Sequence, residues 1–112
     1  MNAVLNALEA DLLISDTRYA EIYVRQRADK GYGPVRIAQE LREKGIEASI
    51  AQAAIEVADT DWLERARRAR VKRFGRPLPT TVADKARQMR FLEYRGFAAA
   101  EIRGVMRATD NE

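Results

Sequence analysis

The stretch KGYGPVRIAQELREKGI, which runs from Lys30 to Ile46, decides the fold because it contains a whole helix with both of its ends. Pro34 suits the first helical turn, where its missing N–H removes no hydrogen bond. Gly31 and Gly45 are placed to end the preceding helix and this one, since glycine readily adopts the positive φ of a helix end. The inner face of the helix is predicted to carry Val35, Ala38 and Leu41.

Helical patterns of this kind continue in both directions, and no segment alternates like a β-strand. Ser15 and Asp16 are predicted to cap a second helix, the residues 59–61 a later one, and Thr80 or Thr81 another. A rigid connector with two prolines occupies residues 75–79. The sequence therefore predicts an all-α protein, with helices near residues 1–12, 17–30, 34–44, 48–58, 62–74, 80–95 and 98–108.

The chain repeats itself after 51 residues, so that residues 34–56 fall on 85–107. Gly45 then meets Gly96, and the predicted inner face of the second copy is Ala86, Met89 and Leu92. Because inner positions match in kind while outer ones drift, each unit is expected to be the same packing of three helices. We expect the last helix of an incomplete repeat over residues 1–14, a complete repeat over 15–59 and a basic one over 60–112.

Composition removes most enzymatic chemistry. The 112 residues include no histidine and no cysteine, and serine occurs only at positions 15 and 49. Ser–His triads, histidine bases, thiol nucleophiles and metals held by Cys or His are therefore excluded. We expect a protein that is not an enzyme and uses no cofactor or metal. The longest apolar run near the start, residues 12–14, is too short for a signal peptide or membrane span, so a cytoplasmic location is expected.

The net charge of +3 is unevenly distributed along the chain. Residues 1–60 have seven Lys or Arg against ten Asp or Glu, whereas residues 61–112 have thirteen against seven. Seven basic residues and one acidic residue lie between Trp62 and Arg76 alone. Such asymmetry predicts a polyanion, or an acidic protein surface, as the partner.

Basic residues on two helices are the candidates for that contact. Positions 65, 68 and 72 share one helix face, and a stripe of this kind neutralises phosphates or meets an acidic groove. The alternative is a solvated face whose alkyl stems cover the core. Arg70 and Arg73 project toward the apolar side and are expected to be structural. The candidate partner- or DNA-binding residues are Arg36, Arg65, Arg68, Lys72, Arg76, Arg87 and Arg90.

Other conspicuous residues have structural interpretations. Phe91 and Tyr94, which alternate with Arg87 and Arg90, could stack on bases, but we expect them to pack between repeats. Trp62 is expected to anchor the core. The loop over residues 30–34 lacks the spacing of a phosphate loop, so Tyr32 is expected to fill a corner. Ordinary surface ion pairs are predicted for Glu40, Glu43 and Glu47.

Three blocks of the sequence resemble the RecX family of bacterial regulatory proteins: Arg18–Ala20, Lys30–Ile46 and Phe91–Phe97. The similarity spans essentially the whole chain, and the second block is the most specific. The resemblance implies tandem three-helix repeats in an elongated, curved body. It also implies a protein that binds the RecA recombinase, especially its filament on single-stranded DNA, and curbs filament extension, ATP hydrolysis and strand exchange without being an enzyme.

The sequence departs from the family pattern near its start, where only the last helix of the first repeat is recognised. An apolar face left without its usual cover predicts self-association, as a homodimer formed through the helix within residues 1–14. Two other functions stay open. The basic half could bind single-stranded or double-stranded DNA directly, or the chain could be a shortened relative that folds but no longer regulates.

Overall fold

A computed structural model describes residues 2–110, and the side chains of residues 15–107. The part of the chain so described consists of six helices and contains no strand, which confirms the all-α prediction. None of these helices is long and apolar enough to cross a membrane. The helices are α1 (Asn2–Asp29), α2 (Pro34–Glu43), α3 (Ala48–Val57), α4 (Trp62–Phe74), α5 (Val82–Arg95) and α6 (Ala99–Asp110).

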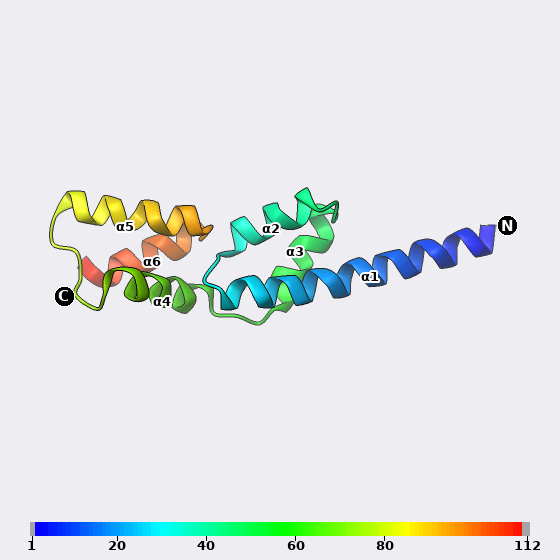
Figure 1. Cartoon of the computed structure of the whole chain (residues 1–112), viewed down its shortest axis with the longest axis horizontal. Helices are drawn as coiled ribbons and strands as arrows, with labels where there is room; N and C mark the ends of the chain where they lie inside the picture. Colours follow the sequence, from blue (N-terminus) through cyan, green and yellow to red (C-terminus); the bar gives the residue numbers. More distant parts are fainter. Residues whose placement is uncertain (1, 111–112) are drawn as a thin grey trace.

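The helices form two bundles that lie end to end (Figure 1). The first bundle packs α1 against α2 and α3, and the second packs α4, α5 and α6 against one another. The body measures 66 × 21 × 19 Å, so the elongated shape is confirmed. In Figure 1 the N-terminal turns of α1 extend beyond α2 and α3, while the end of α5 faces the start of α2.

The first helix is continuous, and the predicted cap at Ser15 and Asp16 is wrong. No glycine or proline occurs between Asn2 and Asp29, and serine or aspartate within a helix costs at most about 0.7 kcal/mol relative to alanine. The helices expected at 1–12 and 17–30 are therefore one helix of 28 residues. The side chains of residues 1–14, on which the homodimer prediction depends, lie outside the described part.

Each bundle has its own apolar core, and one residue joins the two. Val24 and Leu41 are fully buried in the first core, and Leu92 is fully buried in the second, where Val105 is almost fully buried. Trp62, at the start of α4, is half-buried and packs against both clusters. Its predicted role as a core anchor is confirmed, because its ring spans the boundary between the bundles.

The predicted inner faces of α2 and α5 need correction. Val35 is 54% exposed and Met89 is 36% exposed, whereas Ile37 and Gln88 are buried. In α2 the buried residues are Pro34, Ile37 and Leu41, which share one face because they are three and seven residues apart. The shift of 51 residues still holds, since it carries Ile37 onto Gln88 and Leu41 onto Leu92.

Two predicted caps are confirmed by hydrogen bonds. The carboxylate of Asp61 accepts a hydrogen bond of 3.1 Å from the backbone N–H of Glu64 at the start of α4. The hydroxyl of Thr81 accepts one of 3.0 Å from the N–H of Asp84 at the start of α5. Each side chain satisfies a donor that the first helical turn leaves free, so both helix starts are fixed locally.

Candidate partner-binding surface between the repeats

The two bundles meet where α5 ends and α2 begins. The N–H of Gly33 donates a 2.8 Å hydrogen bond to the carbonyl of Arg95, and the N–H of Val35 donates a 2.9 Å hydrogen bond to the carbonyl of Gly96. Free donors of one helix start are thus satisfied by free acceptors of another helix end, with the two helix dipoles aligned head to tail. This pairing fixes the orientation of one bundle on the other.

Glycine is required at both sides of this junction. A Cβ on Gly33 would lie 2.5 Å from the carbonyl carbon of Gly96. A Cβ on Gly96 would lie 2.1 Å from the Cβ of Arg36, and Gly96 also has a φ of +94°. The loop over residues 30–34 therefore has the structural role that was predicted. Its most constrained glycine, Gly33, lies in the contact between the two bundles.

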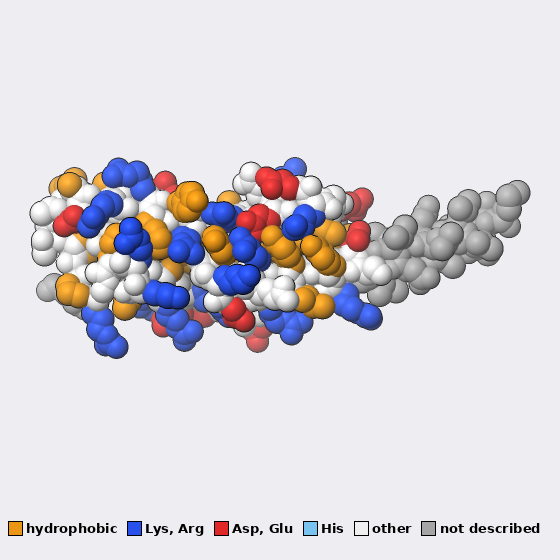
Figure 2. Space-filling view, in the orientation of Figure 1, with side chains coloured by type: hydrophobic (Ala, Val, Ile, Leu, Met, Phe, Trp, Pro, Cys, Tyr) orange, Lys and Arg blue, Asp and Glu red, His pale blue; other side chains and the backbone are white. Residues whose placement is uncertain are grey.

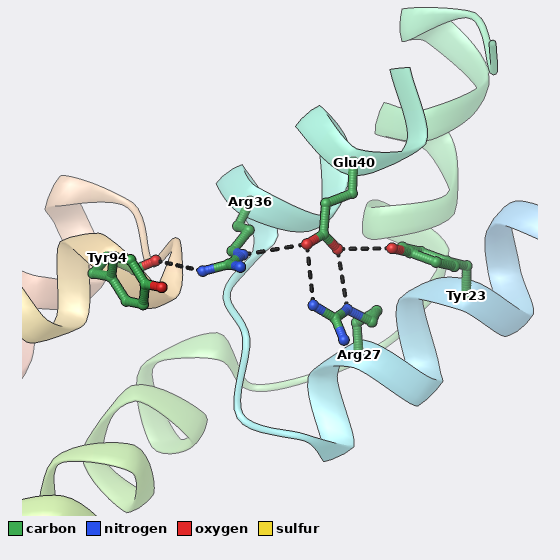
Figure 3. Close-up of polar contacts among 5 residues, drawn as sticks. All are labelled: Tyr23, Arg27, Arg36, Glu40 and Tyr94. Atoms are coloured by element: carbon green, nitrogen blue, oxygen red, sulfur yellow. Dashed lines mark hydrogen bonds and ion pairs between the residues drawn. The ribbon is translucent and has the colours of Figure 1, made fainter. Parts of the chain in front are cut away.

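A network of charged and aromatic side chains covers the junction (Figure 3). Arg27 donates two hydrogen bonds of 3.0 Å to the carboxylate of Glu40, and the hydroxyl of Tyr23 donates another of 2.8 Å. Arg36 donates to the same carboxylate at 3.2 Å and to the backbone carbonyl of Tyr94, in the other bundle, at 3.1 Å. Arg36 is therefore held in place by contacts within the chain.

The network shifts the pKa values of all four titratable side chains that meet at Glu40, and the hydrogen bonds to Glu40 raise those of Arg27 and Arg36. Burial, followed by the hydrogen bond to Glu40, raises the pKa of the Tyr23 hydroxyl to about 12. Burial alone would raise the pKa of Glu40, but the hydrogen bonds from Arg27, Tyr23 and Arg36 outweigh it and lower that pKa below its ordinary value of 4.5. Glu40 is thus a charged centre of the junction, and the interpretation of it as an ordinary surface ion pair was too weak.

Tyr32 lies among three guanidinium groups from three different helices. Its ring centroid is 3.9 Å from the Cζ of Arg27, 4.6 Å from that of Arg36 and 5.1 Å from that of Arg95. The ring is partly buried against the first core, as the prediction of a corner residue required. Because Arg95 belongs to the second bundle, the ring also connects the two bundles through cation–π contacts.

Beside the junction lies a strongly basic hollow, here called the inter-repeat cavity. It has a volume of about 340 Å³ and lies between the end of α1, one face of α4 and the end of α5. Its floor includes Ala69 and Phe91, and Asp29 is the one acidic residue in its described lining. Arg65 forms a 3.1 Å ion pair with that carboxylate. The basic lining residues are Lys30, Arg65, Arg68, Lys72, Arg73 and Arg95.

The structure brings only some of the predicted contact residues together. Three of them, at positions 65, 68 and 72, line the inter-repeat cavity, while Arg76 lies beyond α4 and borders a different hollow. Arg87 pairs with Asp84 at 3.4 Å and lies over the ring of Phe74. Within the described residues no ion pair engages Lys72, Arg76 or Arg90, and all three are exposed. Figure 2 shows Lys and Arg side chains distributed over one face of the body, with hydrophobic side chains between them.

The aromatic and structural predictions have mixed outcomes. Phe91 packs against the second core and meets Phe74 edge-on, with ring centroids 5.3 Å apart. Tyr94 is 72% exposed and so is not buried between the repeats, although the guanidinium of Arg36, from the other bundle, lies 5.1 Å from its ring centroid. Arg70 is buried as expected, but Arg73 is exposed and borders the inter-repeat cavity. Tyr94 and Arg73 are thus more exposed than the helical pattern indicated.

Sequence reasoning missed three of the cavity's basic residues: Lys30, Arg73 and Arg95. One signal could have found two of them. Lys30 begins the loop that contains Gly33, and Arg95 directly precedes Gly96, so both lie close in the sequence to a glycine of the junction. Nothing in the sequence pairs these segments, because they lie more than sixty positions apart.

The fold and the surface define an all-α protein built from tandem three-helix repeats with a basic surface where they join. The family model of the second three-helix domain of RecX matches residues 15–55, and that of the third matches residues 59–106. The chain therefore belongs to the RecX family of regulatory proteins. The repeat bounds of 15–59 and 60–112, preceded by a helix within residues 1–14, stay our proposal.

Curated relatives agree with this assignment. The chain is 41% identical over 112 residues to Regulatory protein RecX of Halorhodospira halophila. The aligned region covers 100% of this chain and 70% of the relative. It is 43% identical over 94 residues to Regulatory protein RecX of Cronobacter sakazakii, with 84% of this chain and 57% of the relative covered. The corresponding protein of Salmonella arizonae is 40% identical over 94 residues, with the same coverage. The chain thus spans little more than half the length of the last two.

Proposed function

We propose that this chain binds the RecA recombinase, or its filament on single-stranded DNA, and inhibits filament extension, ATP hydrolysis and strand exchange. Membership of the RecX family supports the proposal most strongly, because the match extends over both repeats and over the whole chain in one relative. In this function the chain is a binding protein of the cytoplasm and performs no chemistry of its own.

The shape and charge of the molecule support the same function. A body 66 Å long and about 20 Å across is suited to lie along a filament and to touch several of its subunits. The inter-repeat cavity offers six basic residues against one acidic residue, which favours an anionic surface as the partner. The hydrogen bonds between α5 and α2 would keep both repeats in a fixed orientation during binding.

A titration of the chain against RecA on single-stranded DNA, with ATP hydrolysis as the readout, tests the proposal. We expect hydrolysis to decrease as the chain is added, and filament extension to stop in parallel. Unchanged hydrolysis, together with a helical circular dichroism spectrum of the chain, would contradict the proposal. That result would favour a folded relative without regulatory activity.

A second candidate function is direct binding of nucleic acid through the basic residues 61–112. The inter-repeat cavity favours it too, because guanidinium groups bind phosphates as readily as carboxylates. The two functions differ in what binding requires. Binding of bare DNA that is equally tight with and without RecA would support this candidate, whereas binding that appears only with RecA filaments would support the first.

A further inference from the structure

One charged side chain is buried without a counter-charge. Arg70, in α4, is only 4% exposed. Its Nη1 donates long hydrogen bonds to two neutral acceptors, the side-chain oxygen of Gln88 at 3.4 Å and the carbonyl of Pro77 at 3.5 Å. Among the described residues, no carboxylate lies within 4.0 Å of its guanidinium nitrogens.

The first bundle shows that this position does not need a charge. Ala66 and Arg70, four residues apart, are the buried residues of α4, and Ala20 and Val24 have the same spacing among the buried residues of α1. The shift of 51 residues carries Ile37 onto Gln88, so a buried apolar residue in one bundle corresponds to a buried polar residue in the other. An arginine buried among neutral groups is costly, and apolar replacements are often as stable or more stable. Packing alone therefore does not explain Arg70.

Arg70 borders a second hollow along α4, here called the Arg70 cavity. It has a volume of about 480 Å³, and its apolar wall is formed by Val71, Leu78 and Val105. Glu64 is the one acidic residue in its described lining, and it is engaged by Arg67 at 2.6 Å and Arg68 at 3.5 Å. The other basic lining residues are Arg67, Arg68, Lys72 and Arg76.

We propose that the Arg70 cavity binds a phosphate group, with the guanidinium of Arg70 as its innermost ligand. Arginine presents its N–H groups in a fork that matches two phosphate oxygens, and a buried guanidinium lacking a carboxylate gains most from such a ligand. Lys72 and Arg76, which have no ion-pair partner among the described residues, add charge at the rim. The apolar wall favours a phosphate ester, from either a free nucleotide or a polynucleotide backbone.

This site does not depend on the proposed function, because it requires no RecA. Thermal unfolding of the chain is measured with inorganic pyrophosphate, with ATP and with a twelve-residue oligothymidylate, against chloride at equal ionic strength. We expect a saturable rise of the melting temperature with all three phosphate compounds and none with chloride. A stronger response to the oligonucleotide would identify a polynucleotide backbone as the source, and a stronger response to ATP a free nucleotide. Equal shifts with chloride would overturn the proposal.

Two variants locate the effect. R70V/Q88I puts apolar residues, of types buried in the first bundle, at both positions and is expected to fold, with pyrophosphate affinity about tenfold lower or more. R103Q removes one exposed charge from α6, outside the described lining of the cavity, and should respond like the unaltered chain. An unchanged response in R70V/Q88I would overturn the assignment of Arg70.

A measurement on the unaltered chain covers the case in which that variant does not fold. Arginine side-chain NMR resolves the Nε–Hε signals of individual residues in the presence and absence of pyrophosphate. The Arg70 signal should move on titration and reach saturation, while that of Arg103 stays in place. Saturable shifts of other arginines without any shift of Arg70 would overturn the proposal.

Discussion

Gly33 and Gly96, which are 63 positions apart in the sequence, lie so close that a Cβ on the first would be 2.5 Å from the carbonyl carbon of the second. The backbone of one repeat thereby rests directly on the backbone of the next. Hydrogen bonds from Gly33 and Val35 to the carbonyls of Arg95 and Gly96 complete the contact. The junction therefore requires that residues 33 and 96 have no side chain, so that the two backbones can approach closely enough to form these hydrogen bonds.

Alanine at Gly96 should destabilise the protein far more than alanine at Gly45. Both glycines end a helix with positive φ, +94° and +91°, so both variants have backbone strain of about 1–2 kcal/mol. Only at Gly96 does the new methyl group collide, with the backbone and Cβ of Arg36, and a total loss above about 3 kcal/mol is expected. Free energies of unfolding in urea measure both losses. Equal losses in the two variants would contradict the prediction, because they would mean that the junction accommodates the methyl group at Gly96 without loss of stability.

The three clustered basic residues of α4 should matter for binding. Replacing Arg65, Arg68 and Lys72 together by glutamine should weaken binding to RecA filaments about tenfold or more at 0.1 M salt, because the cavity loses half its positive charge. Fluorescence anisotropy of labelled filaments measures the affinity, and circular dichroism checks the fold. Wild-type affinity in the triple variant would refute the assignment.

Two controls separate local from general effects of charge. The triple glutamine variant of Arg18, Arg25 and Arg42 removes the same charge from exposed positions of the first bundle and should bind normally. D29N breaks the ion pair with Arg65 while leaving every basic residue in place. If D29N also binds weakly, the loss of affinity in the triple variant would come from the broken Arg65–Asp29 ion pair at the junction and not from lost contacts with the partner.

Salt should distinguish phosphate contacts from contacts with a protein surface. If Arg65, Arg68 and Lys72 each neutralise one phosphate of single-stranded DNA, the slope of log affinity against log salt should decrease by about 2 in the triple variant. The affinities of the unaltered chain and of the triple variant for an oligonucleotide are measured between 50 and 200 mM salt, about the range in which the counterion effect is large. An unchanged slope would indicate that these residues contact no phosphate.

The Tyr23–Glu40 network should make stability dependent on pH at both extremes. Because the folded pKa of Glu40 is lowered, its stabilisation is complete above its unfolded value of 4.5 and is lost as the pH falls below it. Because the pKa of Tyr23 is raised from 10 to about 12, its contribution is lost as the pH rises through that window. E40Q should unfold about 2 kcal/mol more easily at pH 7, and the difference should shrink below pH 4.5.

E43Q is the matched control for that series. Glu43 lies on the same helix, is exposed, and has no ion pair or side-chain hydrogen bond with any described residue. Its replacement should change the free energy of unfolding by less than about 0.5 kcal/mol across the same pH range. A pH profile of E40Q that stays parallel to that of the unaltered chain down to pH 2 would contradict the role given to Glu40.

Local features of the fold could be predicted from the sequence, because they depend on neighbouring residues. Asp61 and Thr81 each cap a helix whose start lies one residue away. Ser15 and Asp16 led to a wrong prediction of a helix start, since good capping residues are also tolerated inside a helix and no glycine or proline interrupts α1. Val35 was wrongly predicted to face the core for another reason. Val35 and Ile37 are both apolar, and only tertiary packing decides which of them faces inward.

The site was only partly predictable for a related reason. The stripe formed by positions 65, 68 and 72 is a property of one helix and was recognised. Lys30 and Arg95 reach the same cavity from segments that meet only through the Gly33–Gly96 contact. Arg70 was assigned to the structural side because helical phase gives burial but not the charge of the neighbours.

The position of Trp62 gives the protein an optical reporter of its own. It is the one tryptophan in the sequence, and its half-buried indole touches both apolar cores. Its emission should therefore respond to any separation of the two bundles before either of them unfolds. Bending or undocking on a filament can be followed in the native chain, without an attached dye, wherever tryptophan of the partner is absent or replaced.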